Sequence, residues 1–302
     1  MTGTRLIVGI DIGGTKIAAA AVDPHGLVVG PVRSVSTPGG SRDAVVAEVI
    51  RLANALRSEH PGASAVGIGS AGVFDAAGSV TSATDLLPDW AGTPLAALVE
   101  SALGLPVVAL NDVHAAGVAE STVGAGAGHP VALVVAVGTG IGGAVTRDGR
   151  VQTGRTGTAG SLGHVPVSGP SLRACSCGAL GHVEPLASGP GLERTFLELT
   201  GRDLGLREIA AAAAAGDRAA TSVISEGGRL LGEALAGVAN IVDPDVVIVG
   251  GGVAEIGATY LDAVVTGYRA HTLPGPSTAL VQAAALGTTA TLVGAAIAAS
   301  RR

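Results

Sequence analysis

The chain has 302 residues, of which 47% are hydrophobic, so it is long enough for two globular domains with apolar cores. Its formal net charge is −6 and its 18 basic residues are scattered, which argues against nucleic acid as a partner. Charged or turn residues interrupt the apolar segments, no export segment precedes the first predicted strand, and only 2 cysteines are present. We therefore expect a cytoplasmic protein without a membrane span or a disulfide framework.

The first predicted element is a strand over residues 6–10 that leads directly into Asp11-Ile12-Gly13-Gly14-Thr15-Lys16. Glycine has no Cβ, so the backbone N–H groups of such a turn can approach phosphate oxygens, while Thr15 and Lys16 add a donor and a positive charge. A second strand over residues 17–22 completes a hairpin, unlike the strand-turn-helix of dinucleotide and Walker motifs. The pattern indicates a phosphate-binding hairpin with Asp11 facing the phosphate; the alternative is an ordinary Gly-Gly hairpin.

Apolar strands and small-residue helices then alternate, which is typical of an α/β protein. Strands are predicted over residues 28–34, 66–70, 107–110, 131–137, 144–146 and 246–249. Helices are predicted over residues 43–59, 95–103, 113–121, 190–200, 206–215, 218–240 and 287–300, with Ser41 as the N-cap of the first. Residues 154–188 have the composition of a long loop, and both cysteines lie in it.

Two further glycine turns follow apolar strands. The predicted strand 131–137 runs into Gly138-Thr139-Gly140-Ile141-Gly142-Gly143, and residues 144–146 return as its hairpin partner. This repeats the architecture of the first hairpin and suggests two lobes of related design with a phosphate between them. The third turn, Gly250-Gly251-Gly252, follows the strand 246–249.

These three turns, in this order, resemble those of the ROK family of sugar kinases, within the actin-like and hexokinase-like ATPase superfamily. The resemblance covers essentially the full chain and implies a two-lobed actin-like (ribonuclease H-like) α/β fold. The implied N-terminal lobe is residues 1–115 plus 287–302, and the implied C-terminal lobe is residues 116–286. The resemblance assigns ATP, with Mg²⁺, to the glycine turns; the residues it implies are Asp11, Gly13, Gly14, Thr15, Lys16, Gly138, Thr139, Gly140, Gly250, Gly251 and Gly252.

Asn111-Asp112, at the end of a predicted strand, matches the family's Asn-Asp pair facing the sugar. A sugar hydroxyl is a poor nucleophile, so a carboxylate that accepts its proton speeds phosphoryl transfer. Asp112 is therefore the predicted catalytic base, and Asn111 is predicted to orient the sugar by donating to and accepting from ring hydroxyls. The alternative is that Asp112 only caps the helix that follows.

The loop 154–188 holds candidate metal ligands. Cysteine and histidine are zinc ligands, and four of them suit tetrahedral coordination. The resemblance gives His164, Cys175, Cys177 and His182 as a structural Cys2His2 zinc site, in which His182 replaces the family's usual third cysteine. The alternatives are reduced surface thiols and a core histidine.

The same resemblance implies sugar contacts. It assigns them to Gly72, Thr84, Asn111, Asp112, Ser161, His164 and Glu184. Ser161 departs from the family, which has Glu at this position, three residues before the histidine. Loss of that carboxylate makes plain glucose less certain and leaves room for an amino or acylamino group, as in kanosamine, N-acetylglucosamine or N-acetylmannosamine. A free ammonium would by itself prefer the lost carboxylate, unless Glu184 or Asp85 supplies one.

The predicted activity is transfer of the γ-phosphoryl group of ATP to the 6-hydroxyl of a hexose or amino-modified hexose. The resemblance also implies a homodimer or higher homo-oligomer. Sugar-responsive repressors of the family carry a helix-turn-helix domain before the first phosphate hairpin, whereas ten residues precede Asp11 here, so we do not expect a repressor. The other alternative is a catalytically silent sugar-binding or regulatory protein, which Ser161 motivates.

Overall fold

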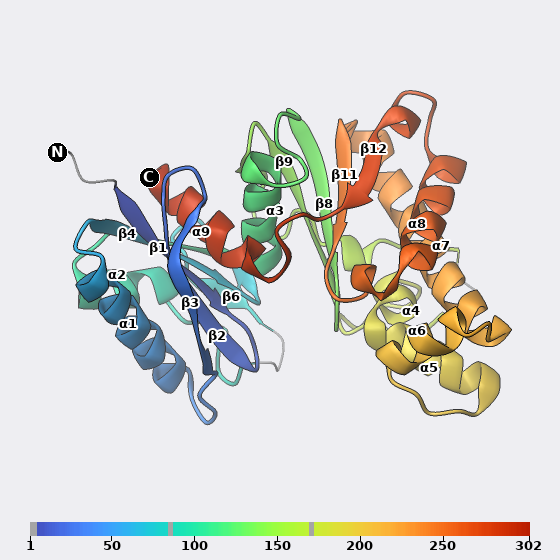
Figure 1. The fold of residues 1–302 in the computed structure, drawn as a ribbon, viewed down its shortest axis with the longest axis horizontal. Helices are drawn as coiled ribbons and strands as arrows, with labels where there is room; N and C mark the ends of the chain where they lie inside the picture. Colours follow the sequence, from blue (N-terminus) through green and yellow to red (C-terminus); the bar gives the residue numbers. More distant parts are fainter. Residues whose placement is uncertain (1–4, 84–86, 169–171) are drawn as a thin grey trace. The chain divides into compact units, whose positions relative to one another are not determined.

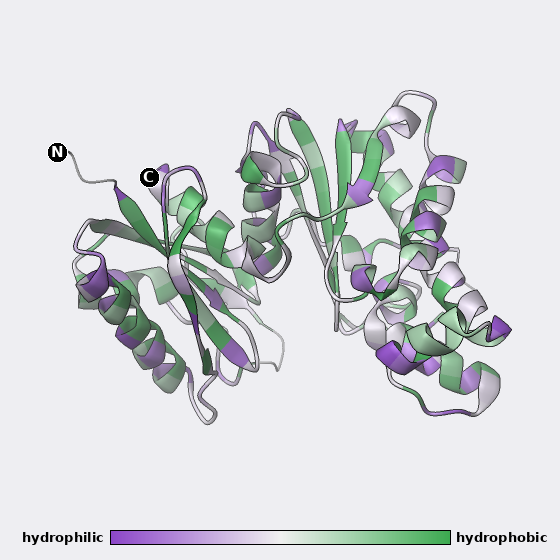
Figure 2. Ribbon diagram, viewed as in Figure 1, coloured by the Kyte–Doolittle hydropathy of each residue, from purple (hydrophilic) through white to green (hydrophobic). Residues whose placement is uncertain are grey.

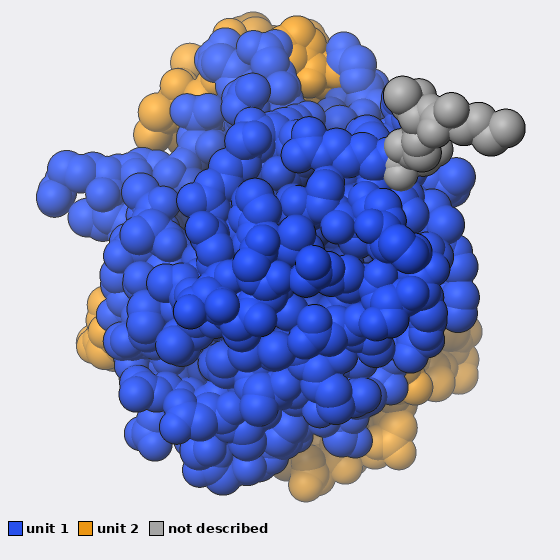
Figure 3. All heavy atoms as spheres, turned by 90° about the vertical axis from the view of Figure 1, so that its left-hand side faces the viewer, with its two compact units in different colours: residues 1–128, 145–159, 288–302 blue, residues 129–144, 160–287 orange. Residues whose placement is uncertain are grey.

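The computed structural model describes residues 5–83, 87–168 and 172–302. The chain folds into two compact units, coloured separately in Figure 3. Unit 1 comprises residues 1–128, 145–159 and 288–302, and unit 2 comprises residues 129–144 and 160–287. Each unit contains a β-sheet with packed helices (Figure 1), so the predicted α/β class with two lobes is confirmed.

Unit 1 is built on a five-stranded sheet in the order β3-β2-β1-β4-β7. Its strands are β1 (Leu6–Ile12), β2 (Lys16–Val22), β3 (Val28–Ser36), β4 (Ala63–Ser70) and β7 (Val107–Asn111). The first three strands are antiparallel, whereas β1, β4 and β7 are parallel, with Ile12 opposite Ser70 and Ser70 opposite Asn111. The carboxyl ends of these three strands therefore meet at one edge of the sheet.

Helices pack on the sheet of unit 1 (Figure 1); they are α1 (Arg42–Glu59), α2 (Leu95–Leu103), α3 (Asp112–Val123) and α9 (Ala290–Ser300). Helices α1 and α2 share an apolar core with alternate residues of β1 and β4. Ser41 caps α1 as predicted, since its Oγ accepts the N–H of Ala44. Gly67 and Gly69 of β4 face α9, where a Cβ would collide with the Ala295 carbonyl and the Thr291 side chain.

Three short strands complete unit 1. Strands β5 (Val73–Phe74) and β6 (Val80–Ser82) form a small antiparallel sheet. Strand β10 (Arg150–Val151) pairs with the last residues of β9 (Ile141–Arg147), which begins in unit 2.

Unit 2 contains β9 together with β8 (Val131–Val137), β11 (Val246–Gly250) and β12 (Leu280–Ala283), in the order β9-β8-β11-β12. Strands β8 and β11 are parallel, almost fully buried and uniformly apolar (Figure 2), as expected for strands covered on both faces. The helices are α4 (Glu184–Ala187), α5 (Gly189–Thr200), α6 (Leu206–Ala214), α7 (Arg218–Val242) and α8 (Ala258–His271).

Short 3₁₀ turns connect these elements: η1 (Leu162–His164), η2 (Ala254–Ile256), η3 (Pro276–Thr278) and η4 (Gly287–Thr289). Helices α7 and α8 pack closely because Gly228 and Gly232 of α7 lie against the α8 backbone; a Cβ at Gly228 would lie 2.6 Å from the Tyr260 carbonyl oxygen. No described helix has the length and apolar character needed to span a bilayer.

The sequence patterns missed α8 and β12, and they placed Gly142 and Gly143 in a turn. Both glycines belong to β9, which begins at Ile141, so the second glycine turn is limited to residues 138–140.

Candidate active site and metal centre

The turn between β1 and β2 is held by its own backbone and by the end of β3. Gly13 donates its N–H to the Lys16 carbonyl at 3.0 Å. Thr37, just after β3, donates its hydroxyl to the Gly13 carbonyl at 2.6 Å and its N–H to the Thr15 carbonyl at 3.0 Å. The predicted phosphate turn is thus a fixed loop at the edge where the parallel strands end.

Two carboxylates lie at this same edge. Asp11 is the penultimate residue of β1, and Asp112 directly follows β7 as the first residue of α3. Burial, and to a lesser extent the nearby charge of Asp112, raise the pKa of Asp11 to about 7, although Lys16 opposes the shift. Burial also raises the pKa of Asp112. Two half-buried acids lie close enough for their charges to repel, and a cation would relieve this repulsion.

Asn111 is engaged within the protein. Its Oδ1 accepts the N–H groups of Val113 and His114 at 2.9 and 3.0 Å, so Asn111, rather than Asp112, is the N-cap of α3. Its Nδ2 donates to the carbonyl of Gly72 at 3.0 Å. The Asn111 side chain also forms a hydrogen bond with the carboxylate of Asp112, which opposes the rise in the pKa of Asp112. The predicted role of Asn111 as an acceptor from sugar hydroxyls conflicts with its capping role.

Asp112 forms one hydrogen bond at the start of α3 but is not its N-cap residue. One of its oxygens accepts the N–H of Val113 at 2.9 Å, while the capping itself is done by Asn111. Helix capping therefore does not by itself account for a half-buried carboxylate at residue 112.

His114 is a neighbour that the sequence patterns did not single out. Its ring is buried, and its Nε2 lies 2.8 Å from the Ala159 carbonyl, which can only accept, so Nε2 carries the proton. Burial lowers the pKa of His114, although Asp112 opposes this shift. The imidazole is thus held neutral beside Asp112. Its position two residues after Asp112 on the same helix is the only sequence signal that could have indicated it.

We predict that Asp11→Asn stabilises the ligand-free protein above neutral pH. A carboxyl whose folded-state pKa exceeds its unfolded value of 3.8 contributes stability below pH 4 that is lost as the pH rises through about 7. The difference between these two pKa values means that the charged carboxylate lowers the free energy of unfolding by roughly 4 kcal/mol at most. Thermal unfolding without nucleotide or metal should therefore show a higher Tm for Asp11→Asn than for wild type at pH 8, and a smaller difference at pH 4.

The matched control is Asp43→Asn, which changes an exposed carboxylate in the first turn of α1. The difference in Tm between pH 4 and pH 8 should be the same for Asp43→Asn as for wild type. An Asp11→Asn protein that loses stability at pH 8 would contradict the assignment of a destabilising buried charge.

The second and third glycine turns contact each other within unit 2. Gly138 donates its N–H to the Gly140 carbonyl at 2.9 Å, closing the second turn. Gly251 has φ +87°, and a Cβ there would collide with the backbone of Val137, the residue before that turn. Val253 donates its N–H to the Val137 carbonyl at 3.0 Å. Glycine is required at residue 251 both for its positive φ and for this close approach.

A cavity of about 850 Å³ opens beside these turns. It is lined by Gly138, Thr139 and Gly252 and by the starts of α5 and α6 with η2; the further lining residues are Gly189, Pro190, Glu193, Gly205, Leu206, Arg207, Glu208, Ala210, Val253, Glu255 and Ile256. This volume suits a small-molecule ligand of nucleotide size. Of this lining, the sequence patterns indicated only Gly138, Thr139 and Gly252.

Two acids of the lining brace its backbone. Glu193 accepts the N–H of Leu206 at 2.8 Å, and Glu208 accepts the N–H of Gly205 at 2.9 Å. These contacts fix the start of α6 against α5.

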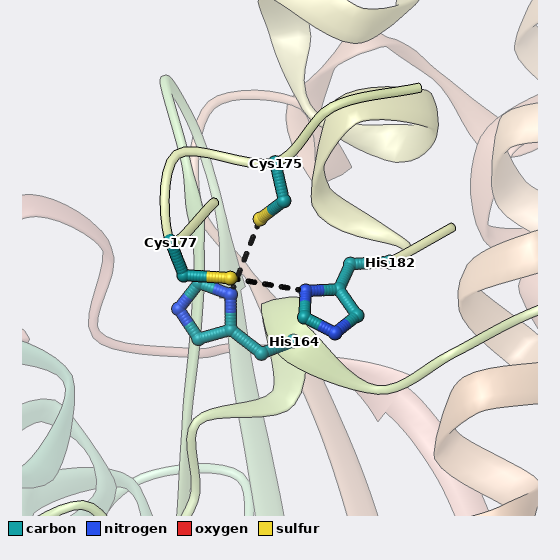
Figure 4. A group of neighbouring side chains, drawn as sticks. All are labelled: His164, Cys175, Cys177 and His182. Carbon is teal, nitrogen blue, oxygen red and sulfur yellow. Dashed lines mark hydrogen bonds between the residues drawn. The ribbon is translucent and has the colours of Figure 1, made fainter. Parts of the chain in front are cut away.

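The four predicted metal ligands come together (Figure 4). One donor atom from each of His164, Cys175, Cys177 and His182 lies within 4.8 Å of all the others. Nδ1 of His164 is 3.3 Å from Sγ of Cys175, and Nδ1 of His182 is 3.3 Å from Sγ of Cys177. Sulfur and nitrogen ligands on one tetrahedral zinc ion are about 3.5 Å apart, so this donor set fits zinc.

Local backbone contacts shape the segment that carries three of these ligands, residues 172–182, which we call the cysteine loop. Cys175 donates its N–H to the Ala179 carbonyl at 2.8 Å, and Gly178, with φ +90°, donates to the Cys175 carbonyl at 2.9 Å. Leu172 and Leu180 of this loop are 74% and 60% exposed. The loop therefore gains little from apolar burial. The buried guanidinium of Arg173 anchors its start to the carbonyls of Pro185 and Gly191, and a metal ion at the cluster would order the remainder.

Glu184 directly follows this region, and its carboxylate has internal partners. Oε1 accepts the hydroxyl of Ser176 at 2.9 Å, and Oε2 accepts the N–H of Ile141 at 2.9 Å. The sequence patterns assigned Glu184 to sugar hydroxyls alone. Each carboxylate oxygen has a second lone pair, so a sugar contact is compatible with these bonds.

Ser161 is exposed and precedes η1, which contains His164. Gly72, with φ +117°, presents the carbonyl that Asn111 binds. Thr84 and Asp85 lie outside the described residues.

Residues 7–302 match the profile of the ROK family. The chain belongs to the ROK family. This ROK protein is 35% identical over 310 residues to a glucokinase of Streptomyces coelicolor, with 96% of each chain covered. It is 32% identical over 300 residues to an N-acetylmannosamine kinase of Salmonella newport, with 96% of this chain and 97% of that relative covered.

Among solved structures, this ROK protein is similar to a ROK family glucokinase from Streptomyces griseus in complex with glucose and AMPPNP. The TM-score is 0.82 and the identity 36%, with 98% of this chain and 100% of that chain covered. The two α/β lobes are those of the ROK and actin-like fold, and the His2Cys2 cluster is consistent with the ROK zinc motif.

Proposed function

We propose that this ROK protein is an ATP-dependent kinase that phosphorylates the 6-hydroxyl of a hexose or an amino-modified hexose. The observation that carries the proposal is the half-buried carboxylate of Asp112 at the carboxyl end of β7, in a chain similar over 96% of its length to sugar kinases. The similar Streptomyces griseus glucokinase was solved with glucose and AMPPNP, the two ligand classes that this activity requires.

ATP is the proposed phosphoryl donor. The cavity beside Gly138, Thr139 and Gly252 has room for the nucleoside, and the two glycine turns of unit 2 supply backbone N–H groups for its phosphates. Thr15 and Lys16 in the β1–β2 turn of unit 1 supply a further donor and a positive charge. Mg²⁺, when bound with the nucleotide, neutralises charge on the transferring phosphoryl oxygens. Asp11 is the residue proposed to hold the ion, because its carboxylate lies at the edge of the sheet where β1 ends and close enough to Asp112 for the two negative charges to repel each other.

Asp112 is the proposed general base. As the bond from the sugar oxygen to phosphorus forms, the carboxylate accepts the hydroxyl proton, and its raised pKa brings its proton affinity closer to neutral pH. The cap made by Asn111 and the neutral ring of His114 fix the first turn of α3, so they position the base. Asn111 is the proposed neighbour of the sugar at the end of β7, where its side chain also contacts the carboxylate of Asp112.

His164 and Glu184 are the proposed sugar contacts of unit 2. In the cluster, Nδ1 of His164 faces the sulfur atoms, which leaves Nε2 to bind a hydroxyl. Zinc at the cluster would fix the tautomer and orientation of that ring. Zinc is proposed as a structural ion, without a part in the chemical step.

Ser161 narrows the range of candidate sugar substrates. The family pattern has Glu at this position, and a short hydroxyl cannot replace the charge-assisted hydrogen bonds that a carboxylate makes with two sugar hydroxyls. Glucose, kanosamine, N-acetylglucosamine and N-acetylmannosamine are the candidates. The relatives include both glucokinases and N-acetylmannosamine kinases, which supports glucose and N-acetylmannosamine among these candidates.

We predict that Ser161→Glu shifts preference toward glucose. Charge-assisted hydrogen bonds contribute about 1.5–3 kcal/mol, so kcat/KM for glucose should rise about tenfold or more relative to that for the best amino or acylamino sugar. Steady-state kinetics on both sugars measures this ratio, with Ser222→Glu on the exposed surface of α7 as the control. An unchanged ratio in Ser161→Glu would show that residue 161 does not select the sugar.

The activity itself is tested by ADP release from MgATP with glucose, mannose, glucosamine, kanosamine and the two N-acetylhexosamines. We expect release that depends on one preferred sugar. The second candidate, a catalytically silent sugar-binding protein, is favoured only by Ser161. It predicts sugar binding by calorimetry with no ADP release from any of the panel.

A further inference from the structure

The cysteine loop is joined to the second glycine turn by two side chains. Ser176 lies between the ligands Cys175 and Cys177 and donates its hydroxyl to Glu184 Oε1 at 2.9 Å. The other oxygen of the same carboxylate accepts the N–H of Ile141, the residue that follows Gly138-Thr139-Gly140, at 2.9 Å. One carboxylate therefore bridges the metal centre and the turn.

Two glycines make room for this bridge. A Cβ at Gly140 would lie 2.8 Å from Glu184 Oε2, which is closer than real contacts allow. A Cβ at Gly163 would lie 3.1 Å from the same oxygen and would also collide with the Ile141 carbonyl. The Glu184 carboxylate thus occupies the space beside Gly140 and lies directly against the turn.

The turn is held from its other end by the continuation of the same segment. Ser188 donates its N–H to the Glu184 carbonyl at 3.1 Å, and Gly189 donates its N–H to the Gly138 carbonyl at 2.9 Å. Residues 184–189 therefore contact the turn at both of its ends, Gly138 and Ile141.

We propose that Ser176 and Glu184 are positioning residues through which metal binding at the cysteine loop orders the turn 138–140 for the phosphates of the nucleotide. Metal ligands on both sides of Ser176, and His182 two residues before Glu184, fix the backbone that carries both side chains. This inference rests on the proposed function, because it assigns nucleotide phosphates to that turn.

Hydrogen bonds that do not involve Ser176 or Glu184 hold the part of the cavity proposed to bind the nucleoside, which is formed by the start of α6 and by η2. Leu206, at the start of α6, is held by Glu193, and Val253, before η2, is held by the Val137 carbonyl. Loss of the Ser176 to Glu184 bond should therefore weaken binding of the phosphates and leave binding of adenosine unchanged.

Calorimetry on the zinc-loaded full chain, without sugar, tests this with AMPPNP and adenosine as probes. Removing one hydrogen bond in Ser176→Ala should raise the Kd for AMPPNP about 2- to 10-fold at an unchanged zinc content and an unchanged Kd for adenosine. Glu184→Gln leaves one acceptor oxygen for two donors, the Ser176 hydroxyl and the Ile141 N–H, so it should raise the Kd for AMPPNP at least as much. Ser176→Thr keeps the hydroxyl and should bind AMPPNP as wild type does, as should the control Ser222→Ala on α7.

Equal affinity of wild type and Ser176→Ala for AMPPNP would overturn the inference, and so would an equal loss of affinity for AMPPNP and adenosine. Wild-type protein that binds neither probe would instead overturn the proposed function, so the two failures are distinguishable.

Discussion

Asp112→Asn is expected to lower kcat by about 10²- to 10⁴-fold, with a much smaller change in KM for the sugar. Asparagine has nearly the same shape and keeps an oxygen that can accept the Val113 N–H, so the first turn of α3 stays intact. It cannot accept the proton of the sugar hydroxyl. Steady-state ADP release, with thermal unfolding to verify the fold, is the measurement.

The neighbouring side chains provide the matched control. His114→Asn removes a buried ring that contacts the Ala159 carbonyl but leaves the carboxylate of Asp112 in place. It should lower kcat less than Asp112→Asn does, because it disturbs the position of the base and not the base itself. An Asp112→Asn protein with a third or more of wild-type kcat would show that another group accepts the proton.

Loss of the metal is expected to have the second largest effect. His182→Ala should abolish binding of one zinc ion per chain and raise amide hydrogen exchange across residues 172–184, since that loop has few buried apolar side chains of its own. Exchange in α1, in unit 1, should remain unchanged. Sugar-dependent ADP release should fall at least tenfold, because His164 and Glu184 lose their fixed orientation.

Two variants sharpen this experiment. His182→Cys supplies a thiolate at the same position, so it should retain zinc and most of the activity. His129→Ala changes a histidine of unit 2 that lies outside the cluster and should behave as wild type. Full zinc content in His182→Ala would contradict the ligand assignment.

Local patterns predicted the parts of the fold in which a strand or helix carries its own signal. The apolar runs of β1, β8 and β11 and the Ser41 cap of α1 are examples, because burial and capping each require particular residues at particular positions. Helix α8 was missed because it contains threonine, glycine and β-branched residues, and it is stabilised by packing against the glycines of α7. Strand β12 has only four residues and depends on its pairing with β11.

The metal ligands could be predicted because four residues of the right chemistry occur within a short segment and the family pattern names them. The hydrogen-bond partners of the other site residues could not be predicted from the sequence. That Asn111 caps α3, that His114 contacts the Ala159 carbonyl, and that Glu184 contacts Ile141 each depend on residues brought together by folding. The glycine-rich composition also hid the surroundings of particular glycines, such as Gly140, where the Glu184 carboxylate occupies the space that a Cβ would take.

The central claim is transfer of the γ-phosphoryl group to the 6-hydroxyl of a sugar. Phosphorus-31 NMR of a reaction of MgATP with the preferred sugar tests it most directly, because a 6-phosphate ester couples to the two hydrogens on carbon 6. We predict a phosphate monoester triplet that grows as the γ-phosphate signal of ATP declines, and that grows about 10²- to 10⁴-fold more slowly with Asp112→Asn. A doublet from another carbon, inorganic phosphate alone, or no change in ATP would contradict the account.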